Sequence, residues 1–449
     1  MSRPTMAPSP PGTETSVDSR RRAMAVTAAV LALLSLVLHL TLAWQLDHLG
    51  VFEKKNMLFD ADTETRLRAI SAGKHLGIKH PNLMPYFTPP ITLAARGLAK
   101  LCPDCGTEPE LQRTLGVMLV PVASALKTML VFYLFCRLGF SSLQAALATL
   151  LSLVSFSTLI FGSIPESFGL TALAMAVAYC FAAASAAELT WRRIILWIAI
   201  GVFATGITLI NIAFVALLLW AASSERRLVA GGIRVAAIAL VIFGVTGASA
   251  YVLDLALVEH EASAGGSASP RSIALDRVVK PIQKQFVTYH DVEDSGRKVR
   301  HFPTAVANAF APPRVATASI DSNGPQRVQF SLEHSPSIFG LGDPLGLSVV
   351  ILIVAGAVCS LAAPRSRRIA VASIGIVAIG WLFSVWGGET QLFSQHWHLP
   401  SVLLIAGVMT VRKYGALMTA VLAVLTFAIA VNNLMVVRGM LAVLSAPAS

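Results

Sequence analysis

The chain has 449 residues, of which 55% are hydrophobic and only 13% charged, with a formal net charge of +11. A soluble domain carries about a quarter charged residues, so this composition excludes a water-facing globular protein and predicts that lipid surrounds most of the chain. The positive charge does not indicate nucleic acid. Much of the Lys and Arg lies in short clusters between apolar runs, where it sets membrane orientation, and no basic stripe interleaves with exposed aromatic residues.

The first predicted element is a disordered cytoplasmic tail over residues 1–22, which are rich in Pro, Ser and Thr. An apolar run from Ala23 to Leu46 follows it. This run is too long for the apolar region of a signal peptide and lacks a clear small-residue cleavage site. We therefore predict an uncleaved first span.

The later apolar runs are also long enough to cross a bilayer, which takes about twenty residues. With the first span, the candidates cover residues 24–46, 114–136, 141–161, 166–187, 234–258, 345–363, 368–387 and 415–435, and a shorter run covers 398–411. One further run, 194–221, is interrupted by the weak point GITLIN, from Gly206 to Asn211.

The positive-inside rule indicates how often the run 194–221 crosses. If two short helices meet near Ile207–Asn211, every short basic loop lies inside with the N-terminus. The predicted fold is therefore an all-α, multi-pass protein of the plasma (inner) membrane with about 11 membrane segments. A break at membrane depth is tolerated where it is buried in protein or lines a wet cavity. Thr208 and Asn211 at this turn thus predict a hydrophilic cavity open to the outside.

This topology divides the chain into a membrane module, a second outer loop, a C-terminal group of helices and a tail. These cover residues 23–258 (with a first outer loop over 47–113), 259–343, 344–435 and 436–449. The first outer loop contains the sequence CPDC, with Cys102 and Cys105. In an oxidising compartment a disulfide is the first interpretation of this pair, and half of a metal site is the second.

The segment NMLFDADTETRLRAI follows the first span and holds Asp60 and Asp62. In an extended loop these two acids and Glu64 point the same way. They could bind a divalent cation such as Mg²⁺ or Mn²⁺ through oxygen ligands, or supply a general base. The alternative is an ordinary solvated loop.

The next segment, KHPNLMPYFTPPITLAARGLAK, is semi-apolar and amphipathic, which favours an interfacial helix lying on the bilayer. His80 in its HPN sequence either contacts a phosphate or caps the segment.

Two further polar sites are predicted on the outer side. FGSIPESFGL forms a short turn that places Glu166 at a helix start, where capping by the helix dipole and function are equally good explanations. WGGETQLFSQHWHLP carries Gln395, His396 and His398, which could contact a phosphate or a sugar hydroxyl. The two histidines are too close for the usual helical zinc spacing.

Taken together, these motifs resemble the GT-C superfamily of polytopic glycosyltransferases. The resemblance rests on the D-x-D after the first span, the HP segment, the short PESF turn and the paired short helices near GITLIN, and it covers Ala23 to Val258. It implies transfer of a sugar from a polyprenyl-phosphate carrier to a lipid, glycan or protein acceptor, at an extracytoplasmic active site.

The resemblance also assigns roles to residues. It implies that Asp60 is the general base and that Asp62 is the alternative base or a metal ligand. Because the leaving phosphate gains negative charge, cations should lie nearby, and the local candidates are Arg66, Arg68, Lys74 and His80. The remaining candidates for substrate binding are Glu166, Asn211, Gln395, His396 and His398.

Two other classes of protein remain as alternatives. A transporter or flippase commonly has two related halves and polar groups near the bilayer midplane. This sequence shows no matching halves and few ionisable residues within its spans, which disfavours that class. A non-catalytic membrane scaffold, whose outer loops bind a partner, is the third hypothesis.

Overall fold

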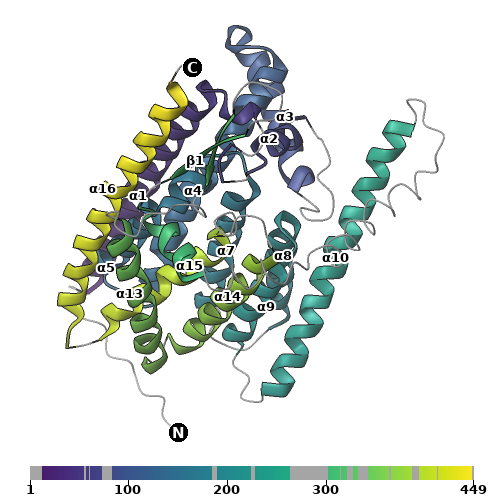
Figure 1. Cartoon of the computed structure of the whole chain (residues 1–449). Coiled ribbons are helices and arrows are strands. Elements are labelled where there is room, and N and C mark those ends of the chain that lie inside the picture. The colour runs from purple at the N-terminus through teal and green to yellow at the C-terminus, as the bar shows by residue number, and fades with distance from the viewer. Residues whose placement is uncertain are drawn as a thin grey trace.

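The structure is a computed structural model in which apolar helices form a bundle that carries a smaller polar part at one end (Figure 1). It describes residues 13–54, 57–59, 61–72, 83–184, 190–223, 228–262, 302–313, 315–320, 327–331, 342–363, 366–386, 394–411 and 413–446.

The first half of the described chain is helical, apart from short connections. Its helices are α1 (Thr13–His48), α2 (Thr63–Ala72), α3 (Leu83–Leu101), α4 (Glu108–Arg137), α5 (Ser142–Val154), α6 (Phe156–Phe161), α7 (Ser167–Ala184), α8 (Trp191–Ile207), α9 (Asn211–Ala222) and α10 (Leu228–Ala262). Two short 3₁₀ turns, η1 (Val51–Glu53) and η2 (Pro103–Cys105), lie before α2 and α4.

The second half begins with a helix over 302–310. Two antiparallel strands follow, β1 (Ala316–Ile320) and β2 (Arg327–Ser331), with Ala316 opposite Ser331. The remaining elements are α13 (Gly342–Ala362), α14 (Arg367–Trp386), α15 (Ser394–Ala406), the 3₁₀ turn η4 (Gly407–Thr410) and α16 (Gly415–Ser445).

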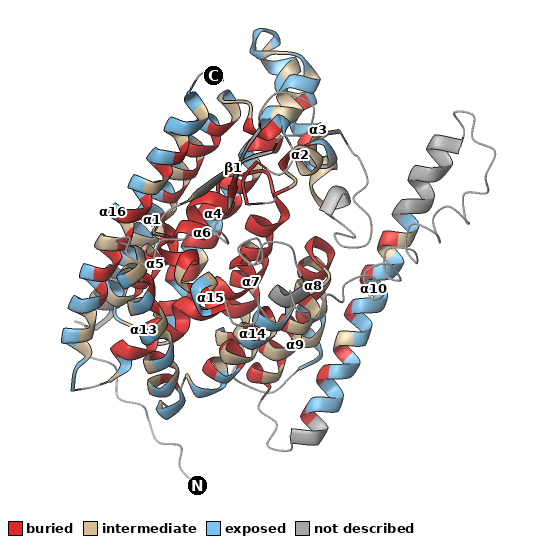
Figure 2. Cartoon of the chain, viewed as in Figure 1, coloured by how far each residue is buried: buried red, intermediate tan, exposed pale blue. Residues whose placement is uncertain are grey.

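Six of the described helices are long and apolar enough to cross a membrane. They cover Arg21–His48, Glu108–Arg137, Ser167–Ala184, Gly231–Val252, Asp343–Ala362 and Gly415–Ser445. Their outward faces carry exposed apolar side chains, such as Val424 and Phe427 of α16, whereas burial concentrates around α4, α6, α7 and α15 (Figure 2). An apolar exterior around a buried centre is the arrangement expected of a helical membrane protein, although the number of crossings remains a prediction.

Two predicted boundaries differ from the structure. Helix α1 begins at Thr13, so the second half of the predicted disordered tail is helical. Helix α16 continues to Ser445, so most of the predicted tail over 436–449 belongs to this helix. In both cases no proline or glycine stops the helix at the end of the apolar run, so it continues beyond the span.

The predicted break in the run 194–221 is confirmed. Helix α8 ends at Ile207 and α9 starts at Asn211, and Thr208 lies in the turn between them. A carbonyl group at the end of α8 finds its hydrogen-bond partner within the turn, because the Asn211 side chain donates to the carbonyl oxygen of Ala204 at 2.8 Å. The predicted disulfide between Cys102 and Cys105 is also present.

The two polar loops pack together at one end of the bundle, near α2, α3 and β1 (Figure 1). The backbone N–H of Phe59 donates to Phe330 of β2 at 3.0 Å, and that of Phe330 donates to Met57 at 2.9 Å. Earlier in the second loop, the carbonyl oxygen of Phe310 accepts a hydrogen bond from Asn433 of α16. The second loop is therefore held both to the first loop and to the bundle.

The predicted orientation can be tested by labelling with a membrane-impermeant maleimide. Lys100→Cys on α3 should react in intact cells, because the first loop is predicted to lie outside. Ser142→Cys at the start of α5, which is equally exposed in the fold, should react only after permeabilisation. Both variants are made in a background without the 5 native cysteines. The reverse pattern would invert the topology.

Candidate functional site

The candidate site is built around the turn between α6 and α7, where the chain leaves helical geometry inside the bundle. Residues 155–170 are all buried. A break buried this deeply must hydrogen-bond its polar groups internally, because no water replaces the lost helical partners. The surrounding helices supply those partners.

Two side chains from other helices contact this turn. Ser124 of α4 donates to the carbonyl oxygen of Gly162 at 3.2 Å. His39 of α1 lies 3.0 Å from the hydroxyl of Ser163, which in turn donates to Leu159. Gly162 is required here, because an added Cβ would lie 2.5 Å from the Thr158 carbonyl oxygen and 2.6 Å from the His39 ring.

Glu166, at the end of the turn, forms an ion pair with Arg66 of α2. The guanidinium Nε lies 3.1 Å from Oε2, and the two side chains are 12% and 2% exposed. The backbone N–H of Ser167 also donates to this carboxylate at 2.8 Å, so Glu166 caps α7 and binds Arg66 at once. The capping interpretation of Glu166 therefore describes only part of its contacts.

The charges around Glu166 come from both outer-loop motifs. Burial raises the pKa of Glu166 above its ordinary value, whereas Arg66 and the Ser167 N–H oppose this shift. Asp62 lies close enough to act on Glu166 as a second negative charge. Two acids, Asp62 and Glu166, therefore lie near the interface between α2 and the turn, and Arg66 pairs with Glu166.

A second polar cluster lies at the turn between α8 and α9. The Asn211 side-chain oxygen is 3.1 Å from Nδ1 of His396. The hydroxyls of Thr171 and Thr208 lie 3.1 Å apart, and the Asn211 amide is 3.5 Å from Thr171. The ring of Phe168 packs edge-on against His396. Asn211 and His396, which are far apart in sequence, are thus brought together.

Gln395, His396 and His398 do not lie in an exposed loop before the apolar run, and their position on the outer side of the membrane stays a prediction. Helix α15 begins at Ser394, and all three side chains are 2% exposed and packed among the helices. The apolar run after them continues their helix, so the polar residues are drawn into the bundle with it. The two histidines point to different neighbours, since His398 packs against Phe310 while His396 contacts Asn211.

The remaining predicted residues are not gathered at this site. Arg68 is 63% exposed and pairs with Glu64 one helical turn away. Asp60, Lys74 and His80 lie outside the described residues, so their roles stay predictions. Within the described ranges, no group of three His, Cys, Asp or Glu side chains could hold a metal ion, and a metal bound by Asp60 and Asp62 also stays a prediction.

The sequence analysis missed two buried ionisable residues, Lys127 of α4 and His39 of α1. Their exposures are 3% and 0%, and both lie in runs assigned as spans. The signal was present, because an ionisable residue within a span is a functional candidate by default. The spans hold few ionisable residues in total, and for this reason Lys127 and His39 were not considered singly.

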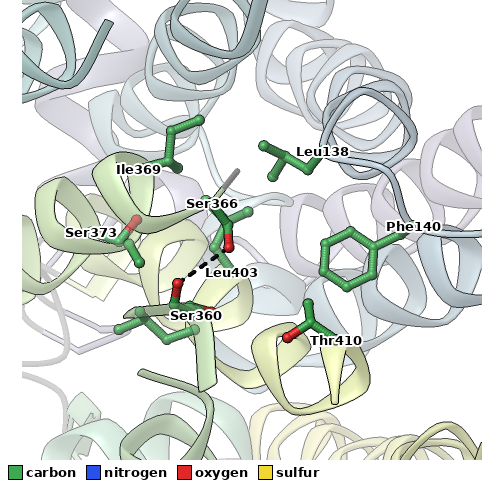
Figure 3. A pocket seen from close by; sticks show the side chains of 10 residues that line it. Leu138, Phe140, Ser360, Ser366, Ile369, Ser373, Leu403 and Thr410 are labelled. Carbon is green, nitrogen blue, oxygen red and sulfur yellow. Dashed lines mark hydrogen bonds between the residues drawn. The ribbon is translucent and has the colours of Figure 1, made fainter. Parts of the chain in front are cut away.

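A surface pocket elsewhere does not serve this chemistry. It has about 310 Å³ of empty space and lies beyond the end of α4, near the turn between α13 and α14 (Figure 3). Its lining includes Leu138, Phe140, Ser366 and Thr410, and none of the described residues that line it is charged. The polar clusters, not this pocket, are therefore the candidate site.

No protein-family model matches the chain, and no curated protein sequence matches it.

The tight packing of the turn predicts that Gly162→Ala is destabilising. The added methyl group must displace His39 or the backbone, which costs about 1–3 kcal/mol. Thermal unfolding in detergent should show a melting temperature several degrees lower, as expected for a loss of about this size. Gly232→Ala is the control, since its Cβ would meet nothing within 4 Å and alanine favours the helix. Equal effects of the two substitutions would contradict the packing account.

The buried ion pair predicts non-additive substitutions. Arg66→Met leaves the Glu166 carboxylate unpaired and should destabilise by about 3–5 kcal/mol. The double variant Arg66→Met, Glu166→Met should recover most of this loss. The pair of Arg68 and Glu64 on the same helix supplies the control, because its arginine is 63% exposed and ion pairs open to solvent contribute about 0–1 kcal/mol. A double-mutant cycle on unfolding measures both couplings, and equal values would contradict the burial argument.

Proposed function

We propose that the chain is a membrane glycosyltransferase of the GT-C type, which moves a sugar from a polyprenyl-phosphate donor to an acceptor on the outer face. One observation carries the proposal: two motifs that are distant in sequence meet in space. Arg66, from the acidic segment after the first span, contacts Glu166 of the PESF turn, 100 residues away. Asp62 acts on the same carboxylate.

The proposed chemistry is an inverting transfer, in which a base removes the acceptor hydroxyl proton while the lipid phosphate leaves the anomeric carbon. Asp60 is the proposed base, and Asp62 is the alternative base or a ligand of Mg²⁺ or Mn²⁺. Arg66 is already paired with Glu166, so we assign it to hold α2 against the turn. Arg68, Lys74 and His80 are then the cations proposed to face the leaving phosphate.

The backbone before Asp60 supports this assignment. Phe59 has a φ of 52°, a left-handed conformation that bulky residues rarely adopt. It is held there by the hydrogen bond of its N–H to Phe330 and by the edge-on packing of its ring against Phe156. Strained residues persist where surrounding structure enforces them, and they cluster at active sites. The following residue is therefore a good position for a catalytic carboxylate.

The second loop is proposed to recognise the acceptor. Its strand β2 is hydrogen-bonded to residues 57–59, directly before Asp60. A loop fixed at this position can present an acceptor hydroxyl to the base without a large movement.

The main test is sugar transfer in reconstituted membranes with a panel of radiolabelled polyprenyl-phosphate sugars and a membrane extract as acceptor. Asp60→Asn should lower the rate by at least about a hundredfold, the contribution typical of a general base, with its folding unchanged. Asp104→Asn, an exposed acid of the same loop, should retain full activity. Loss of transfer in the presence of a chelator would indicate that the reaction requires a bound metal ion. An active wild type with fully active Asp60→Asn and Asp62→Asn variants would refute the site.

The burial of Lys127 and His39 within spans favours one alternative, a transporter or flippase for a lipid or glycan. The two functions separate in one experiment. A flippase should move lipid between leaflets in an Asp60→Asn variant and lose this movement in a Lys127→Met variant, whereas a non-catalytic scaffold should be indifferent to both.

A further inference from the structure

Lys127 is a buried cation at the level of the middle of the first span. The neighbouring Thr128 hydroxyl lies 3.0 Å from that of Ser35, midway along α1. The Lys127 ammonium group donates to the Thr158 hydroxyl at 3.4 Å. None of the ion pairs among the described residues includes it.

Two histidines from other helices lie near this cation. His39 of α1 and His398 of α15 both interact electrostatically with Lys127. Both are at most 2% exposed, and their Nε2 atoms have no hydrogen-bond partner in the described part of the chain. The nearby hydroxyl of Ser157, just before Thr158, is also buried without a partner. Polar groups that lack a hydrogen-bond or ion-pair partner thus lie in one region, and they come from α1, α4, α6 and α15.

Burying these polar groups without partners costs free energy of folding. Buried polar groups in native proteins nearly always have partners, and a buried ammonium without a counter-charge is strongly unfavourable. The neutral Thr158 hydroxyl cannot neutralise Lys127. An anion with several oxygens would satisfy the cation and the neighbouring donors together.

We propose that His39, Lys127 and His398 form a buried binding site for a phosphate monoester group. The polar atoms come from three helices, so a tetrahedral anion, whose oxygens point in different directions, suits them better than a planar carboxylate. Ser163 donates to Leu159 and therefore accepts from Nδ1–H of His39, which leaves Nε2 of a neutral ring as an acceptor. The P–OH of a monoanionic phosphate would donate to this atom.

A lipid is the proposed source of the phosphate. The cluster lies beside the first span at mid-depth, where a polyprenyl chain stays in the bilayer. Its identity as polyprenyl monophosphate, the carrier left after sugar transfer, rests on the proposed function. Phe310 of the second loop packs against one member of the cluster, because its ring centroid lies 4.9 Å from that of His398.

The test is ligand-induced stabilisation of the full-length protein in detergent, without sugar donor or acceptor. Polyprenyl monophosphate should raise the melting temperature of the wild type, and the neutral polyprenol should not. Lys127→Met should weaken this binding by at least about tenfold, equivalent to about 1.4 kcal/mol. Without ligand, the same variant should be as stable as the wild type or more so, because the unpaired buried charge is gone. Lys100→Met, an exposed lysine of α3, is the control.

Each outcome decides the proposal. If inorganic phosphate stabilises the wild type and polyprenyl monophosphate does not, the anion site stands and its lipid source is refuted. Equal stabilisation of wild type and Lys127→Met, or none of the wild type by either phosphate, refutes the site. Should Lys127→Met fail to fold, His398→Asn replaces it and must show the same weakening. Because binding is measured without transfer, its loss is distinguishable from the loss of activity in Asp60→Asn.

Discussion

The structure depends on one constraint, the need to satisfy a non-helical turn inside an apolar bundle. Between Phe161 and Ser167 the backbone loses its helical partners where water is absent. Ser124, Ser163 and Glu166 replace these partners with hydrogen bonds at 3.2, 2.7 and 2.8 Å. Each of these side chains is fixed by a neighbouring element, so the turn determines how α1, α2 and α4 pack around it.

This constraint explains why polar chemistry gathers at the centre of an apolar protein. A buried side chain that hydrogen-bonds to the turn needs partners for its own remaining polar atoms. Further polar side chains are therefore buried around it. Glu166 brings in Arg66, and Ser163 brings in His39. Lys127 has no carboxylate partner among the described residues, and for this reason we propose a ligand for it. The catalytic proposal and the phosphate proposal therefore concern opposite sides of the same turn.

The outer loops complete this arrangement from the water side. Residues 57–59 pair with β2, and Phe59 packs on Phe156 just before the turn. Asn433 of α16 donates to the carbonyl oxygens of both Val154 and Phe310, so one side chain ties α5 to the second loop. A polar layer locked to the bundle in this way can hold acceptor and lipid carrier at a fixed height relative to the bilayer.

The sequence alone determined the membrane class, the helical segments and the broken run at Gly206 to Asn211, because hydropathy, charge and length act locally. It also indicated Glu166 and the acids after the first span as unusual residues. Only the tertiary structure paired Arg66 with Glu166 and Asn211 with His396, and showed that Gln395 and His396 belong to the same buried helix as His398. The two pairs join residues a hundred or more positions apart. Helix packing selects these pairs, and no local sequence pattern encodes it. For the same reason the sequence did not single out Lys127, and only its buried surroundings show that its charge has no carboxylate partner among the described residues.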